Sequence, residues 1–314
     1  MDNGKNNLKK ALLGMVIILS IILGFFLVYY AGEKAYKAIF KKKIRIEYFS
    51  DRLISEVKRM NTVISAAQNT PVDLATILEF HPTSEEEMKI LLRSVLFNNE
   101  EICGSAVAYE PFNYNKDSLY YSFYAYRSND SVTFSNLNGP VYNYFYKDWY
   151  LIPKTLKQPV WSEPYFDEGG GNLLMSTYSV PFYQFLENGE EFAGIVTIDV
   201  SIEWLADAVA SVGSILHSRA ALISENGTIL AAPNRELVYN ETIFTIAEER
   251  KLPVLRDIGR ELQQGKSGFK KGTDEGKVWY IFYSVMPTNG WGIILFVSED
   301  ELMERETTSL KELL

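Results

Sequence analysis

Aromatic and acidic side chains gather in the middle of this sequence, and their chemistry suits a small cation. Of the 20 tyrosines, 13 lie between Tyr109 and Tyr183. Two carboxylates set among aromatic faces can hold an amine through charge-assisted hydrogen bonds and cation–π attraction. A lysine nearby could hold a carboxylate at the other end of the same ligand. The candidate ligand-binding residues are Tyr142, Lys147, Trp149, Tyr150, Tyr165, Asp167 and Asp199.

The same residues can instead serve only to build the fold, and their spacing alone favours this interpretation. Tyrosines in this number can form the core of a sheet, and the aspartates can be turn and cap residues. The sequence lacks the residues that an enzymatic interpretation needs. Its histidines, His81 and His217, are far apart and too few for a histidine-based triad or metal site. Residues 265–267 read Gly-Lys-Ser but lack the spacing of a phosphate-binding loop. We therefore expect no enzymatic activity, no metal and no cofactor.

A membrane anchor is predicted near the N-terminus. Residues 11–32 form an uncharged run of 22 residues, longer than the ~20 that cross a bilayer, and we expect an uncleaved helix. Residues 1–45 carry a net charge of +7 and the rest of the chain −16, so nucleic acid is excluded as a partner of this acidic body. More basic residues follow the run than precede it, and this asymmetry alone would place the body in the cytoplasm.

Beyond the apolar run, the sequence predicts a long helix and then a shorter one. Apolar residues recur every seven positions from Ile39 to Ala67, which is typical of a dimerising stalk or of a helix packed on its own domain. Pro71 is expected to end this helix. A second helix is predicted to begin at Ser84, with Glu87 completing a capping box.

From residue 102 the pattern changes to short β-rich runs, which predict an antiparallel sheet followed by a helix at 202–212. A second sheet-like unit begins at Ala220. Each unit ends in a strand that turns into a helix, a weak internal repeat that indicates two copies of one small α+β module. The predicted strands are 103–109, 119–126, 173–183 and 191–200 in the first unit, and 278–286 and 291–297 in the second.

The stretch from Asp148 to Tyr183 resembles the double Cache (dCache) sensor domains of bacterial transmembrane receptors. It contains a Trp-Tyr pair at 149–150 and the segment PVWSEPYFD at 159–167, and a later strand ends near Asp199. The resemblance extends over roughly residues 35–300 and implies two PAS-like modules in tandem, of which the membrane-distal one binds the ligand. It also implies that the body lies outside the inner membrane, in the periplasm, against the charge asymmetry.

Family members that recognise amino acids share a spaced set of Tyr, Arg, Trp-Tyr, Tyr-x-Asp and a final Asp. The candidate residues match this set except at Lys147, which stands where an arginine would grip the ligand carboxylate. Lysine keeps the charge but lacks the planar, bidentate fork. The resemblance therefore leaves an amino acid, an amine without a carboxylate and another small metabolite open as ligands. The rival interpretation is a membrane-tethered structural or interaction protein, a degenerate receptor that binds nothing.

Together with the resemblance, the sequence predicts an α+β chain with a small-molecule ligand, a membrane and, through the stalk, a second copy as partners. The output that such a sensor would control is a phosphatase of the PP2C type, a histidine kinase or a chemotaxis signalling domain. The predicted parts are a cytoplasmic N-terminus at 1–10, a transmembrane helix at 11–32, the stalk and second helix at 33–98, the membrane-distal module at 99–212, the membrane-proximal module at 213–300, and the start of a truncated exit helix at 301–314.

Overall fold

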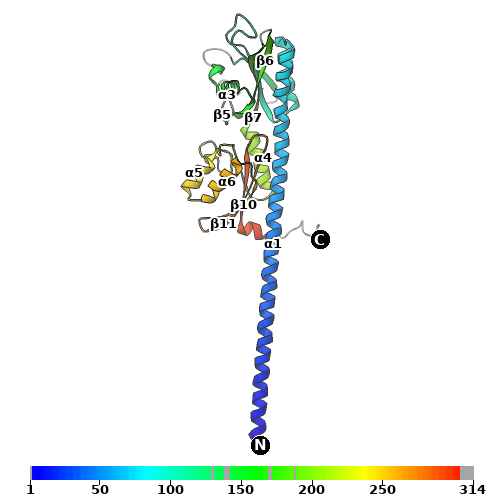
Figure 1. Cartoon of the computed structure of the whole chain (residues 1–314), viewed down its shortest axis with the longest axis vertical. Helices are drawn as coiled ribbons and strands as arrows, with labels where there is room; N and C mark the ends of the chain where they lie inside the picture. The colour runs from blue at the N-terminus through cyan, green and yellow to red at the C-terminus, as the bar shows by residue number, and fades with distance from the viewer. Residues whose placement is uncertain (1, 129–130, 138–141, 169–171, 187–188, 305–314) are drawn as a thin grey trace. The chain divides into compact units, whose positions relative to one another are not determined.

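The computed structural model describes residues 2–128, 131–137, 142–168, 172–186 and 189–304 (Figure 1). The chain divides into two compact units, Met1–Phe49 with Asp300–Leu314 and Ser50–Glu299. The second unit holds two antiparallel sheets and every candidate ligand-binding residue. The predicted α+β class is confirmed.

The N-terminal helix α1, Asp2–Phe80, is longer than predicted because Pro71 does not end it. Proline inside a helix costs about 3 kcal/mol, since one hydrogen bond is lost and the ring crowds the preceding turn. The turns beyond it are held by packing, because Leu74, Ala75 and Leu78 are buried in the core of the first sheet. Each buried leucine contributes about 1.5–3 kcal/mol, so burial outweighs the proline. The prediction that the helix ends at Pro71 is wrong.

The seven-residue stripe of α1 divides into two parts. Its later members, from Leu53 to Ala67, are buried in the monomer, whereas Ile39 is 69% exposed. The interpretation as a helix packed on its own domain therefore applies to the later part. Dimerisation through the earlier part stays a prediction.

The predicted transmembrane segment, residues 11–32, lies within α1. The side chains of residues 11–14, 16–18 and 21 lie outside the described residues. Over the part of the chain that the structure describes, no helix has both the length and the apolar character needed to cross a bilayer. Of the predicted exit helix, residues 305–314 also lie outside the described residues.

The first sheet has the strand order β3-β2-β1-β7-β6-β4, with β5 paired to β6. Its two long strands, β6 and β7, form a hairpin, and β7 also pairs with β1 at the centre of the sheet. The four predicted strands are confirmed, with ends that differ by up to three residues. The strands are β1 Ile102–Tyr109, β2 Ser122–Ser128, β3 Ser131–Ser135, β4 Val160–Trp161, β5 Tyr165–Phe166, β6 Leu174–Leu186 and β7 Gly189–Ser201.

The two faces of this sheet pack against different helices, because side chains alternate along each strand. Val107 and Val196 point to the core shared with α1 and α2, Glu85–Asn98. Ala106 and Ile195 point to the opposite face, which is covered by α3, Asp148–Leu156. Figure 1 shows α3 and α1 on opposite sides of the sheet. The candidate site is built on the α3 face.

Helix α2 begins as the sequence predicts. The backbone N–H of Ser84 donates to Glu87 Oε2 at 2.8 Å, and the Glu87 N–H donates to Ser84 Oγ at 3.4 Å. We expect Ser84→Ala to lower the free energy of unfolding by about 1 kcal/mol, because the Glu87 N–H loses its acceptor and the Glu87 carboxylate loses the hydrogen bond that the Ser84 hydroxyl donates. Chemical denaturation measures this. The matched change Ser94→Ala, at an exposed position of the same helix, should cost less than ~0.5 kcal/mol, and equal losses would contradict the cap.

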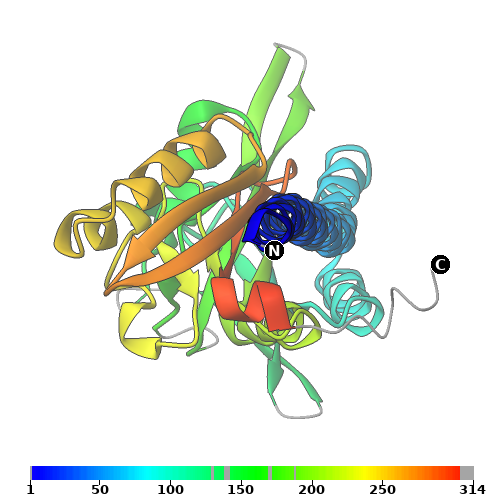
Figure 2. The same ribbon diagram turned by 90° about the horizontal axis from the view of Figure 1, so that it is seen from below.

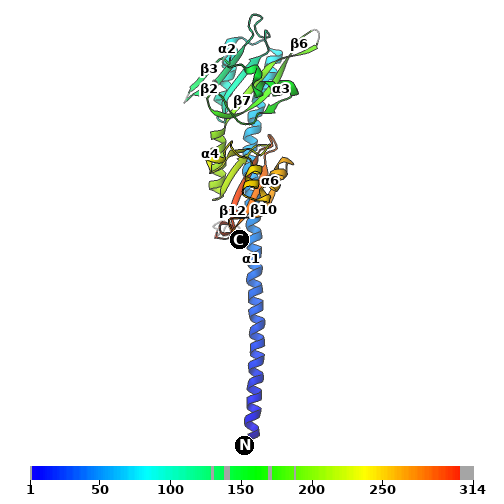
Figure 3. The same ribbon diagram turned by 90° about the vertical axis from the view of Figure 1, so that its left-hand side faces the viewer.

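The second sheet repeats the topology of the first. After β7, helix α4 leads into it (Figure 3). Its strand order is β10-β11-β12-β8-β9, and α5 and α6 cover one of its sides (Figure 2). In each sheet the first and last strands in sequence pair at the centre, so the order β2-β1-β7-β6 corresponds to β9-β8-β12-β11. The elements are α4 Ile202–Ile215, β8 Arg219–Ile223, β9 Ile229–Ala231, α5 Ile243–Glu249, α6 Pro253–Gln263, β10 Gly268–Asp274, β11 Lys277–Val285, β12 Gly292–Ser298 and α7 Glu299–Glu304.

Candidate functional site

Asp199 lies on the central strand β7, where it pairs in register with Gly104 of β1 and Thr177 of β6. Its carboxyl group is almost completely buried and accepts a hydrogen bond from Thr177 Oγ1 at 2.7 Å. A Cβ atom at position 104 would lie 2.4 Å from Asp199 Oδ2. Glycine at 104 therefore provides the space that the carboxyl group occupies.

Asp167 follows strand β5 and is also buried, at 4% exposure. It accepts a hydrogen bond from the Tyr142 hydroxyl at 2.9 Å, and Trp149 Nε1 donates to that hydroxyl oxygen at 3.3 Å. The backbone N–H of Asp167 donates to the carbonyl of Leu173 at 3.0 Å. The indole, the phenol and the carboxylate thus form one chain of hydrogen bonds that fixes the Asp167 side chain.

Two further tyrosines lie near Asp199. The Tyr165 hydroxyl is 2.8 Å from Thr177 Oγ1, the group that donates to Asp199. The hydroxyl of Tyr124 is buried next to the same carboxyl group, where it favours the charged form of Asp199.

Burial raises the pKa of Asp199 from its ordinary value to about 7. The hydrogen bond from Thr177 opposes this shift, the negative charge of Asp167 adds to it, and the neighbouring Tyr124 hydroxyl favours the charged carboxylate. No lysine or arginine among the described residues forms an ion pair with Asp199. A buried carboxylate without a cation is unfavourable, so the site is complementary to a positively charged group.

The other two candidates lie in different surroundings. Tyr150 is buried, and its hydroxyl donates to Glu110, which also pairs with Lys154 at 2.6 Å. It therefore belongs to the wall of the aromatic core. It is not part of the aspartate network, the hydrogen-bonded side chains of Tyr142, Trp149, Tyr165, Asp167, Thr177 and Asp199. The Lys147 ammonium lies 4.7 Å from the ring centroid of Tyr142, which places it at the edge of the network.

The structure thus brings together five of the seven candidates, places Lys147 beside them and turns the polar end of Tyr150 away. The sequence did not reveal Gly104, Tyr124 or Thr177, because their proximity to Asp199 depends on strand register. Residues two apart on a strand share a face of the sheet, so Gly104 lies on the same face as Ala106. This would have placed Gly104 at the site once it was known which face of the sheet carries the site. Ligand binding by these residues stays a prediction. The residues on the α3 face with polar or steric roles are Gly104, Tyr124, Tyr142, Trp149, Tyr165, Asp167, Thr177 and Asp199.

A family model described as methyl-accepting chemotaxis protein-like, first PDC sensor domain, matches residues 88–207. This range contains the first sheet apart from its leading helix, and all of the candidate residues. Residues 88–207 are therefore similar to the first sensor domain of these chemotaxis proteins. The family match and the aspartate network concern the same part of the chain.

Known proteins resemble the chain beyond this module. It is 25% identical over 254 residues to the methyl-accepting chemotaxis protein TlpQ of Pseudomonas aeruginosa, a match that covers 69% of this chain and 33% of that protein. The chain thus spans about a third of the length of that relative.

Solved structures share the fold of both sheets. The extracellular domain of the putative histidine kinase mmHK1S-Z2 aligns with a TM-score of 0.70 at 22% identity, covering 82% of this chain and 99% of that one. The ligand-binding domain of the amino acid chemoreceptor PctB of P. aeruginosa, in complex with L-Arg, aligns with a TM-score of 0.57 at 18% identity, covering 83% and 98%. The resemblance to double Cache sensor domains is confirmed.

Proposed function

We propose that this chain is the extracytoplasmic sensory part of a transmembrane receptor, and that its membrane-distal module, residues 99–212, binds a small molecule with a protonated amine. The observation that carries the proposal is the buried carboxyl group of Asp199, which has a raised pKa and no ion-pair partner within the described residues. An ammonium group at this position would supply the charge that the fold lacks. Sensing, not catalysis, is the activity that this arrangement serves.

The ligands named for similar sensor domains belong to the same chemical class, small molecules with an ammonium group. Sensor domains of this fold have been solved with amino acids: PctB with L-Arg and with L-Gln, and Mlp24 with asparagine. Each of these ligands carries an ammonium group. For the present chain, the aspartate network and the faces of Tyr142 and Trp149 would receive that group by hydrogen bonding and cation–π attraction.

Lys147 is the residue that would bind the carboxylate of an amino acid ligand. Its ammonium lies against the ring of Tyr142, whose hydroxyl is bonded to Asp167, so a bound amino acid could reach the aspartates and the lysine at once. We expect Lys147→Gln to weaken binding of an amino acid about tenfold and to leave a simple amine unaffected, because one charge-assisted hydrogen bond is lost. Calorimetry with matched ligands measures this. Equal losses for both ligands would remove Lys147 from the site.

A path for the signal begins at the same strand. Asp199 lies three residues before the first residue of α4, which leads directly into the second sheet. Movement of the end of β7 on binding would be transmitted to α4 by the covalent chain. A ligand can shift this equilibrium only by its difference in affinity for the two arrangements. We propose that closure on the ammonium group supplies that difference.

The test is a thermal-shift screen of the full chain, in a mild detergent, against amino acids, polyamines and small organic acids. A ligand that binds the native state raises the melting temperature by mass action. An increase with amines or amino acids that disappears in Asp199→Asn supports the proposal. A lack of effect from every amine would instead favour the rival, a degenerate receptor with a structural or interaction role.

A further inference from the structure

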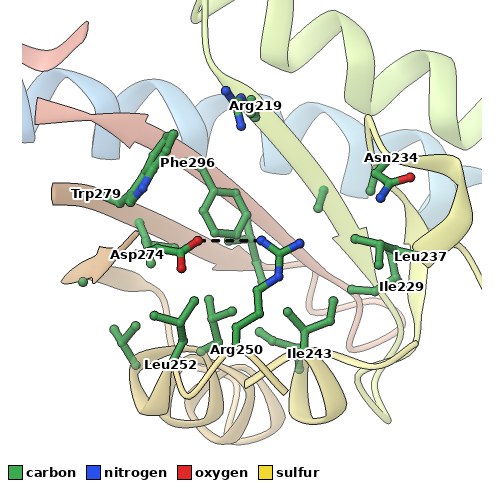
Figure 4. Close-up of a pocket in the computed structure, with 18 of the residues that line it drawn as sticks. Arg219, Ile229, Asn234, Leu237, Ile243, Arg250, Leu252, Asp274, Trp279 and Phe296 are labelled. Carbon is green, nitrogen blue, oxygen red and sulfur yellow. Dashed lines mark ion pairs between the residues drawn. The ribbon is translucent and has the colours of Figure 1, made fainter. Parts of the chain in front are cut away.

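A concave site lies in the membrane-proximal module, between β8, β11 and β12 on one side and α5 and α6 on the other (Figure 4). The cavity has a volume of about 260 Å³, slightly below the ~300–1,000 Å³ of sites for drug-sized ligands. Its lining is mainly aliphatic and aromatic. Its apolar side chains include those of Ile229, Ile243, Leu252, Trp279 and Phe296.

The charged groups of this cavity are two arginines and one aspartate. Arg250 Nη1 lies 3.7 Å from Asp274 Oδ2, beyond hydrogen-bond distance, so the guanidinium keeps donors for another acceptor. The guanidinium of Arg219 lies 5.3 Å from the ring centroid of Trp279. Figure 4 shows Arg250 and Asp274 reaching toward each other across the apolar floor, with Arg219 on the strand above. The site therefore has an excess of one positive charge.

The cavity occupies the position in the second sheet that the aspartate network occupies in the first. Asp199 lies three residues before α4, and Phe296 lies three residues before α7. In register, Asp199 pairs with Gly104 and Thr177, and Phe296 pairs with Arg219 and Ile281. All three members of the second set line the cavity. At equivalent positions, the carboxylate and its space-providing glycine are thus replaced by an aromatic ring and an arginine.

We propose that the membrane-proximal module binds a small monocarboxylate with an apolar body, a second ligand of opposite charge to that of the distal site. The carboxylate would be held by Arg250 and Arg219, because guanidinium groups pair with carboxylates through parallel hydrogen bonds. The apolar body would lie on Trp279 and Phe296. This site is separate from the amine site and does not require it.

The test uses benzoate and hexanoate as probes, with benzamide and benzylamine as neutral and cationic controls, on the full chain in mild detergent. We expect saturable binding of the carboxylates by calorimetry, with a Kd of about 1 mM or tighter. Binding should change the tryptophan fluorescence, and Trp279→Phe should remove that change because this indole lines the cavity. Arg250→Gln and Arg219→Gln should each weaken binding about tenfold.

Two controls separate this site from others. Arg256→Gln changes another partly exposed arginine, paired with Glu248 and outside the cavity, and should leave carboxylate binding unchanged. Asp199→Asn should also leave it unchanged, so failure of the amine site and failure of this one are distinguishable. The proposal is overturned if the carboxylates do not bind saturably, if benzamide or benzylamine bind equally well, or if both arginine variants, folded by their melting curves, bind as the natural chain does.

Discussion

The Asp199→Asn variant is expected to bind an amine or amino acid ligand at least ~100-fold more weakly than the natural chain at pH 8. At this pH the carboxyl group, with a pKa of about 7, is mostly ionised in the natural chain. Asparagine keeps the size of the side chain and an oxygen that can accept from Thr177 Oγ1. Only the charge is removed, and loss of one partner of a buried ion pair typically costs ~3–5 kcal/mol. Calorimetric titration of both proteins measures the difference.

The matched control for this change is Asp148→Asn. Asp148 is the first residue of α3 and is exposed, so this variant removes the same charge next to the site without touching the network. Its affinity should stay within about twofold of the natural chain. Equal losses of affinity in the two variants would mean that the overall negative charge near the site, and not a direct contact with Asp199, attracts the ligand. Unchanged affinity in Asp199→Asn would exclude this carboxylate from the site.

Without ligand, the natural chain should lose stability relative to Asp199→Asn as the pH rises from 4 to 8. The folded-state pKa of Asp199, about 7, lies above the ~3.9 of an unfolded chain. The folded protein therefore binds more protons than the unfolded one between these values, and the free energy of unfolding falls through this window. The difference of about three pKa units corresponds to roughly 4 kcal/mol.

Chemical denaturation of both proteins at several pH values measures this effect. The comparison with Asp199→Asn is essential, because all other titrating groups contribute equally to the two proteins. A difference in stability that is constant from pH 4 to 8 would show that Asp199 is ionised in the folded state with an ordinary pKa. An amine ligand should remove most of the difference, since it stabilises the charged carboxylate.

Local signals in the sequence predicted the elements that depend on local chemistry. The capping box at Ser84 defines the start of α2, and the alternating apolar runs define β1, β6 and β7. The prediction that the helix ends at Pro71 was wrong, because the residues beyond the proline are held in the helix by their packing in the core of the first sheet. Strand β10 was not predicted, since its residues are mostly polar and alternate between half-buried and exposed positions at the edge of the sheet.

The candidate site was predictable to the extent that its residues lie in one sequence motif. Tyr142, Trp149, Tyr165 and Asp167 lie within 26 residues, and their hydrogen bonds join residues that the motif already groups. The contribution of Gly104 could not be foreseen, because it depends on which residue of β1 pairs with Asp199. Tyr150 shares the motif, yet its hydroxyl turns to Glu110, a residue outside it.

The most direct test of the central claim is the number of protons exchanged when an amine ligand binds at pH 7. Calorimetry in two buffers of different ionisation enthalpy gives this number. Because Asp199 is about half protonated at this pH and an ammonium group requires its charged form, the natural chain should release about half a proton per ligand. Release of no protons, or the same release by Asp199→Asn, would contradict binding of the amine at Asp199.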